Sequence, residues 1–235
     1  MNAWTACTFD SAHVPDWAAD NYQKILPYVT SFLTSKHPYR NGVMCPFVPK
    51  AVKEGLIYYT YYQNDTAAGS GHVLRNLLLD FKRLIGESNG AIVVILKENF
   101  SIEELLKIHI ANKKRCIKSS VMLGALYKTN SATSLHSTEY YPLRTPTPTL
   151  VLRNLTSSDL VFLNPTHYSR FERIAFLSAF IRKFSGAAEK SSFTRQQVST
   201  ANELRAKYLK ELIGSWAKII TALILTISTL LLLRG

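Results

Sequence analysis

The sequence contains few cysteines and few charged residues. Its three cysteines, at positions 7, 45 and 116 of 235, are odd in number and widely spaced. Such spacing does not resemble the disulfide framework of a small secreted domain, and no Cys-x-x-Cys pair or Cys/His cluster gives a zinc motif. Charged residues make up 19% and apolar residues 47% of the chain, which predicts a folded protein with a sizeable core.

Several well-defined catalytic motifs are also absent. The chain has no G-x-S-x-G, no H-E-x-x-H and no protein-kinase signature. The glycines at 69 and 71 lack the remaining residues of a phosphate loop or of a dinucleotide-binding turn. None of these common hydrolase, zinc-protease or nucleotide-binding classes is therefore indicated.

Basic residues are in excess, 28 against 16 acidic ones, and two clusters stand out. The first comprises Lys113, Lys114, Arg115 and Lys118, and the second Arg205, Lys207, Lys210 and Lys218. Such clusters can bind nucleic acid or an anionic membrane, although most are simply solvated helix faces. Without interleaved aromatic residues or a recognised motif, nucleic acid is an unlikely partner. The second cluster adjoins an apolar tail, which favours the membrane.

The C-terminal tail has the composition of a membrane span. Residues 219–233 carry no charge, and the stretch 212–233 would be about 33 Å long as a helix, enough for a hydrocarbon core of about 30 Å. Lys218 can extend to the headgroups and Trp216 suits the interface. The run is apolar nearly all round, unlike a buried core helix. Basic residues precede it and only Arg234 follows, which predicts a single-pass anchor with the main domain facing the cytoplasm.

Hydrophobic periodicity predicts an α/β fold in the rest of the chain. We expect a mixed sheet of about five strands flanked by helices, plus the C-terminal transmembrane helix. The expected strands are 56–62, 91–96, 121–127, 150–154 and 159–163. The expected helices are 71–86, 101–118, 168–184 and 201–212, and one or two further helices within 15–35 with a kink at Pro27. This gives a globular domain at 1–185, a linker at 186–200, and an amphipathic helix running into the anchor at 201–235.

The segment 37–49 is the first candidate for chemistry, because it places Cys45 between an Arg/His-bearing turn and a Pro-x-x-Pro frame. Proline after a cysteine fixes the backbone and removes an amide donor, which suits thiolate ligation of haem iron. Arg40 and His37 can meet haem propionates through charge-assisted hydrogen bonds. The alternative is that Cys45 is a small buried apolar residue and the prolines only shape a loop.

A second candidate segment is 140–154, where prolines at 146 and 148 favour an extended chain entering a strand. Arg144 and Arg153 flank this entry and can clamp carboxylates. The alternative is an edge strand with exposed arginines. His136, just upstream, can act as a catalytic acid or a second ligand, or can be an ordinary surface-loop histidine.

Together these segments resemble an uncharacterised bacterial domain family of the DUF type, over about residues 17–185. The shared pattern is H-P-x-R-x-G-x-x-C-P-F-V-P at 37–49, L-H at 135–136, P-L-R-[ST]-P-x-P-x-L-x-[LI]-R at 142–153, and D-x-x-F-L at 159–163. Asn154 departs from this pattern, in which a histidine is expected after the arginine. The cysteine loop is more distantly similar to the small haem-thiolate N-oxygenases of the YqcI/YcgG type.

This second resemblance implies a tail-anchored haem-thiolate oxygenase that acts on a small nitrogen-containing substrate. It makes Cys45 the axial iron ligand, and Arg40, Arg144 and Arg153 the residues that hold propionates or a substrate carboxylate. An electron-donor protein would be a partner. The rival hypothesis is a non-catalytic, membrane-anchored interaction module without a cofactor.

Overall fold

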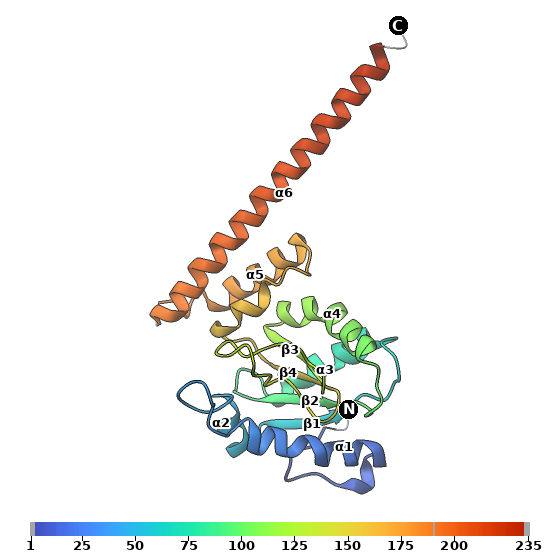
Figure 1. Cartoon of the computed structure of the whole chain (residues 1–235), viewed down its shortest axis with the longest axis vertical. Coiled ribbons are helices and arrows are strands. Elements are labelled where there is room, and N and C mark those ends of the chain that lie inside the picture. Colours follow the sequence, from blue (N-terminus) through green and yellow to red (C-terminus); the bar gives the residue numbers. More distant parts are fainter. Residues whose placement is uncertain (1–2, 190, 233–235) are drawn as a thin grey trace. The chain divides into compact units, whose positions relative to one another are not determined.

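The structure is a computed structural model that describes residues 3–189 and 191–232; side chains are not described at 217–219, 221–222 and beyond 223 (Figure 1). Contacts divide the chain into two compact units, Met1–Leu155 and Thr156–Gly235. Each unit is described by itself below.

The first unit contains a four-stranded mixed sheet in the order β1-β2-β4-β3. The strands are β1 (Ile57–Tyr61), β2 (Ala91–Ile95), β3 (Val121–Leu126) and β4 (Thr149–Asn154). β1 runs parallel to β2, whereas β4 is antiparallel to both β2 and β3. The predicted mixed α/β fold is therefore confirmed, with one strand fewer than expected.

The expected fifth strand, 159–163, is wrong: it lies within a 3₁₀ helix, η3 (Ser157–Leu163). The Asp159 carboxylate accepts hydrogen bonds from the Thr156 N–H at 2.7 Å and from the Thr156 hydroxyl at 2.9 Å. This capping box satisfies donors at the first turn and so starts a helical turn in place of a strand. The pattern of apolar residues in 159–163 is compatible with a strand and with a helical turn, so it could not distinguish them.

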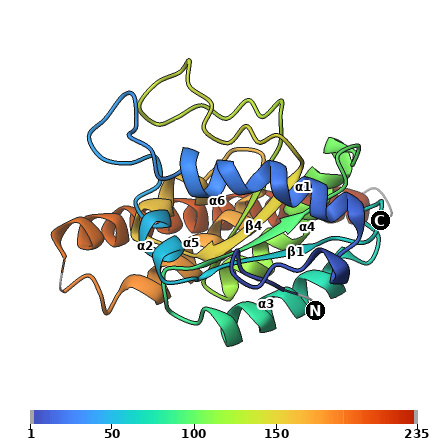
Figure 2. The same ribbon diagram turned by 90° about the horizontal axis from the view of Figure 1, so that it is seen from below.

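Helices cover both faces of the sheet in the first unit. On one face, α3 (Ser70–Leu84) and α4 (Ile102–Lys118) pack on Ile92 and Val94; on the other, α1 (Asp16–Pro27), η2 (Tyr28–Phe32) and α2 (Val48–Lys53) pack on Val93 and Ile95. Figure 2 shows α1 and α3 on opposite sides of the strands. Alternate residues of β2 thus enter two cores, which explains its unbroken apolar sequence.

The second unit consists of η3, α5 (Arg170–Phe184) and α6 (Ser192–Leu232). A capping box between Ser169 and Glu172 starts α5. α6 pairs with α5 and begins at Ser192, inside the segment 186–200 expected to be a linker. The Tyr208 hydroxyl of α6 donates to Asn164 Oδ1 at 2.7 Å, and the Arg173 guanidinium lies 4.6 Å from the Tyr208 ring centroid.

Within the described part of the chain, no helix combines the length and apolar character needed to cross a membrane. Most side chains of the predicted anchor 212–233 lie outside the described residues. The membrane span accordingly stays a prediction.

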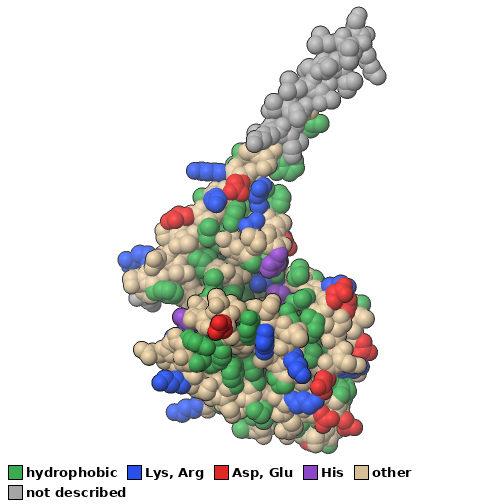
Figure 3. Space-filling model, viewed as in Figure 1, with side chains coloured by type: hydrophobic (Ala, Val, Ile, Leu, Met, Phe, Trp, Pro, Cys, Tyr) green, Lys and Arg blue, Asp and Glu red, His purple; other side chains and the backbone are tan. Residues whose placement is uncertain are grey.

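The first basic cluster does not form one exposed patch. Lys113 is buried, and Arg115 Nη1 donates to the carbonyl oxygen of Gly71 at 2.6 Å. On the face drawn in Figure 3, Lys and Arg side chains are interspersed with Asp and Glu side chains. A continuous basic surface for nucleic acid is not seen there.

Candidate functional site

The candidate site lies at one edge of the sheet in the first unit, where β1, β2 and β3 end. These three strands run in the same direction, because β4 is antiparallel to both β2 and β3. Leu126, Thr149 and Ile95 face one another across this edge. It carries the segment 96–101, which leads into α4, and the β3–β4 loop, residues 127–148. Ligands of open α/β sheets bind beyond the carboxyl ends of strands, so this edge is where a site is expected.

The segment with Cys45 lies against the β3–β4 loop. We call residues 33–47, which join η2 to α2, the cysteine loop. Tyr140 of the β3–β4 loop donates its hydroxyl to Met44 Sδ at 3.4 Å, and the Tyr28 hydroxyl donates to the Pro142 carbonyl at 2.6 Å. The ring centroids of His37 and His136 are 5.5 Å apart. The two segments singled out from the sequence therefore meet in space through His37, His136 and Tyr140.

His37 is a buried, neutral side chain that stabilises its own loop. Its Nδ1 accepts the Tyr39 N–H at 3.0 Å, so a proton on the neutral ring is on Nε2, which lies 3.5 Å from Ser134 Oγ. Burial lowers the pKa of His37, and the positive charge of Arg40 lowers it further, as does His136 when that ring carries a proton. A neutral ring with both nitrogens occupied is not a charged donor for a propionate.

The three arginines proposed as anion ligands do not converge. Arg40 donates to the carbonyl oxygens of Asn41, Val43 and Met44 at 2.8, 2.7 and 3.0 Å, so it holds the cysteine loop. Those bonds use three of the guanidinium's five N–H donors within its own loop.

Arg144 and Arg153 lie at different edges of the sheet. Arg144 Nε donates to the Asn130 carbonyl at 3.0 Å, and its guanidinium stacks 3.8 Å from the Tyr141 ring centroid. Arg153 pairs with Ala91, the first residue of β2, and is therefore at the opposite end of β4 from the candidate site.

Cys45 is half-buried and packs against the apolar cluster beneath α1. Its N–H donates to the Leu33 carbonyl at 2.9 Å. Burial raises the pKa of the nearby Tyr28, and the Cys45 thiolate and Tyr140 would raise it further. A haem on Cys45 would also need donors for its propionates near that sulfur. Arg40 and Arg144 donate to main-chain oxygens and Arg153 lies at the opposite end of β4, so the three arginines do not converge on Cys45; haem ligation by Cys45 stays a prediction.

His136 is exposed in the β3–β4 loop, and its N–H donates to Ser134 Oγ at 3.2 Å. Among the described residues, no group of three or more His, Cys, Asp or Glu side chains is placed to hold a metal ion. His136 thus lies at the surface and contacts the ring of His37. The catalytic role expected for His136 stays a prediction.

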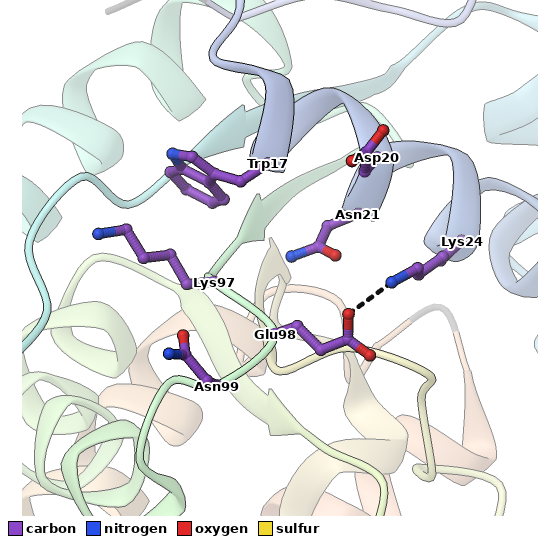
Figure 4. Close-up of a pocket in the computed structure, with 7 residues that line it drawn as sticks. All are labelled: Trp17, Asp20, Asn21, Lys24, Lys97, Glu98 and Asn99. Carbon is purple, nitrogen blue, oxygen red and sulfur yellow. Dashed lines mark hydrogen bonds and ion pairs between the residues drawn. The ribbon is translucent and has the colours of Figure 1, made fainter.

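Sequence reasoning missed a cavity at the same edge of the sheet, shown in Figure 4. It is an open hollow with a volume of about 640 Å³. Its lining comes from α1 (Trp17, Asp20, Asn21, Lys24) and from the segment after β2 (Lys97, Glu98, Asn99). Two features of the sequence could have indicated this hollow. Trp17, Asn21 and Lys24 have the i, i+4, i+7 spacing of one helix face, and the polar residues 97–99 directly follow a buried strand.

Hydrogen bonds and ion pairs hold the walls of this cavity. Asn21 is buried, and its Nδ2 donates to the Leu96 carbonyl at 2.9 Å. Lys24 forms an ion pair with Glu98, and the Lys97 ammonium lies 2.6 Å from an Asp65 carboxylate oxygen. The hydrogen bond and charge of Lys24 lower the pKa of Glu98, so this carboxylate stays ionised.

Comparison with known proteins gives one match. No curated protein and no solved structure matches the chain. The model of a domain of unknown function, DUF6875, matches residues 22–196, which include both loops and the segment 97–99. The match confirms the expected resemblance to an uncharacterised domain family, whereas the resemblance to N-oxygenases stays a prediction. The chain therefore belongs to the DUF6875 family of domains of unknown function.

Proposed function

We propose that this protein is a non-catalytic binding module, tethered to a membrane by residues 212–233, whose partner docks on the cysteine loop and the β3–β4 loop. One observation carries the proposal: both loops expose large apolar side chains. Leu135 is 68% and Tyr39 52% exposed, and Phe47 and Leu143 are also exposed. Apolar groups gathered on adjoining loops are typical of protein-interaction surfaces.

Contacts between the loops favour a pre-formed surface. Tyr28 and Tyr140 tie the β3–β4 loop to η2 and to the cysteine loop, and Arg40 holds the cysteine loop from within. The β3–β4 loop has 22 residues and no regular helix or strand, a length that is uncommon unless the loop is functional. Pre-organised loops reduce the entropy lost on binding, which supports recognition rather than simple connection.

The membrane tether is supported by the composition of 212–233 and by the described part of α6. Ile213 and Trp216 are exposed on that helix, where lipid or the membrane interface would cover them. Four basic residues in 205–218 suit the anionic inner leaflet. Deleting 212–233 should therefore move the protein from the membrane fraction to the supernatant; retention in the membrane fraction contradicts this part of the proposal.

Site-specific photocrosslinking tests the docking surface. A benzophenone amino acid is placed at Leu135 in the full chain, and at Leu79, an equally exposed leucine on α3, as the matched control. We expect a discrete protein adduct from position 135 and none from position 79. No adduct from 135, or the same adduct from both positions, contradicts the proposal.

An absorption spectrum tests the rival oxygenase. The full chain, expressed with a haem supply, is reduced under carbon monoxide. We expect no Soret band. A red-shifted Soret band that is lost in a folded Cys45→Ser variant would instead establish thiolate-ligated haem and replace the proposed function.

A further inference from the structure

The second unit contains an antiparallel helical hairpin whose open end lies where the apolar tail begins. α5 and α6 pack on each other, and α6 continues as one helix into the tail (Figure 1). Arg170, the first residue of α5, forms an ion pair with Glu211 of α6, and Arg173 donates to the Tyr208 hydroxyl at 3.2 Å. Glu211 directly precedes the predicted membrane span 212–233. The first turn of α5 therefore lies at the level where that span starts.

Phenylalanine side chains are exposed at this end of the second unit. Phe171, next to Arg170, is 59% exposed. Phe162 of η3 is also exposed, and it lies two residues before Asn164, whose Oδ1 accepts a hydrogen bond from the Tyr208 hydroxyl at 2.7 Å. Single exposed apolar residues are common, but here two large aromatic ones lie at one level of α6, just before an apolar tail. Exposed rings at that level are expected where lipid covers them.

The turns of α6 at the same level carry positive charge. Arg205, Lys207 and Lys210 lie in the two turns before the predicted span, and both lysines are exposed. Glu211, the one acidic residue of these turns, is paired with Arg170. Exposed lysines beside aromatic rings suit the headgroup region of a bilayer with anionic lipid, where the charges meet phosphates and the rings meet the upper acyl chains. This combination favours a lipid surface as the cover for this end of the unit.

The opposite end of the hairpin lies far from the tail. Phe193, near the start of α6, is 49% exposed. It lies 18 positions before Glu211, a helical rise of about 27 Å. A helix tilt of about 20° shortens this height only to about 25 Å. The polar region on each side of the hydrocarbon core is only about 5–8 Å thick. Phe171 can therefore reach the bilayer while Phe193 stays in water.

We propose that the second unit rests on the membrane that holds the tail, with Phe171 of α5 inserted among the headgroups of a bilayer that contains anionic lipid. The inference rests on the membrane tether of the proposed function, and it adds a contact from a second helix. That contact makes the hairpin part of the membrane-binding surface rather than only a spacer before the tail.

Quenching by spin-labelled lipids tests this contact in the full chain. A genetically encoded coumarin amino acid replaces Phe171, Phe193 or Ile220, one position at a time, and each protein is reconstituted in vesicles of phosphatidylcholine and phosphatidylserine. Phe193 is the matched control, and Ile220, exposed on α6 within the predicted span, reports insertion of the tail. With the spin label near the headgroup, coumarin at 171 should lose most of its emission and coumarin at 193 should keep it. Coumarin at 220 should respond to a label near the end of the acyl chain. Aqueous iodide should quench 193 more than 171.

The outcomes separate this inference from the tether. Quenching at 220 without quenching at 171 overturns the inference and leaves the tether standing, whereas no lipid quenching at any position overturns both. Equal lipid quenching at 171 and 193 also overturns it, because the level along α6 then makes no difference. Protection of 171 from iodide without lipid quenching means that protein, such as a second copy of the chain, covers Phe171 instead.

Discussion

Replacing His37 with asparagine should remove a pH dependence of stability from this fold. His37 Nδ1 accepts the N–H of Tyr39, two residues further along the chain. An asparagine side-chain oxygen accepts the same N–H in an Asx turn, so His37→Asn keeps the turn without a titratable group. The variant loses the ring contacts with His136 and Tyr140, a cost of about 1–2 kcal/mol at pH 7.5.

The sign and size of the pH effect follow from the pKa of His37. Burial lowers that pKa in the folded protein below the value of about 6.5 expected in the unfolded chain. The unfolded chain therefore binds the proton more readily, and the free energy of unfolding falls as the pH drops below about 6.5. The slope from one group is at most about 1.4 kcal/mol per pH unit, and it ends at the pKa of the folded state.

Urea denaturation followed by circular dichroism at pH 7.5, 6.5 and 5.5 measures this slope. Wild type should lose stability with falling pH, and His37→Asn should lose less by the contribution of that one group. His72→Asn is the matched control, because His72 is exposed on α3, on the other face of the sheet from the cysteine loop, and its substitution leaves His37 and its contacts in place. A His37→Asn variant with the wild-type slope would refute the reasoning.

Three further predictions concern the core, a thiol and a strand end. Leu77→Ala, fully buried, should cost about 2–5 kcal/mol in urea denaturation, and a loss below about 1 kcal/mol would contradict the described core. Burial raises the pKa of the Cys116 thiol to about 12. Iodoacetamide at pH 8 should therefore modify the exposed Cys7 in the folded protein and modify Cys116 only in denaturant, which mass spectrometry measures. Asn154→Ala should cost about 1–3 kcal/mol, because Asn154 Nδ2 donates to two carbonyls of the loop 86–88; unchanged stability would show that those carbonyls are solvated instead.

The strands and helices of the first unit were largely predictable. The expected strand 91–96 is observed as Ala91–Ile95, and the helix expected at 101–118 as Ile102–Lys118. An unbroken apolar run and a 3.6-residue period are local properties, so the sequence carries them directly. At 159–163 the apolar residues suggested a strand, but the Asp159 carboxylate accepts a hydrogen bond from the Thr156 N–H and this local bond starts η3 instead.

The candidate site was only partly predictable. The sequence singled out His37 and His136, and their rings are in contact. It also grouped Arg144 with Arg153, but Arg144 lies in the β3–β4 loop before β4, and Arg153 lies near the far end of that strand. The strand residues 149–153 alone extend the chain by about 13 Å, so a short separation in sequence does not bring the two side chains together.

The sequence alone therefore determined most of the strands and helices of the first unit, the two-sided burial of β2 and an apolar C-terminal tail. Only the tertiary structure decided which side chains meet. Asn21 and Leu96 are 75 residues apart, yet their hydrogen bond joins the two walls of the cavity. Such contacts depend on strand order and on how α1 packs across the sheet, which are set by the whole core rather than by any local pattern.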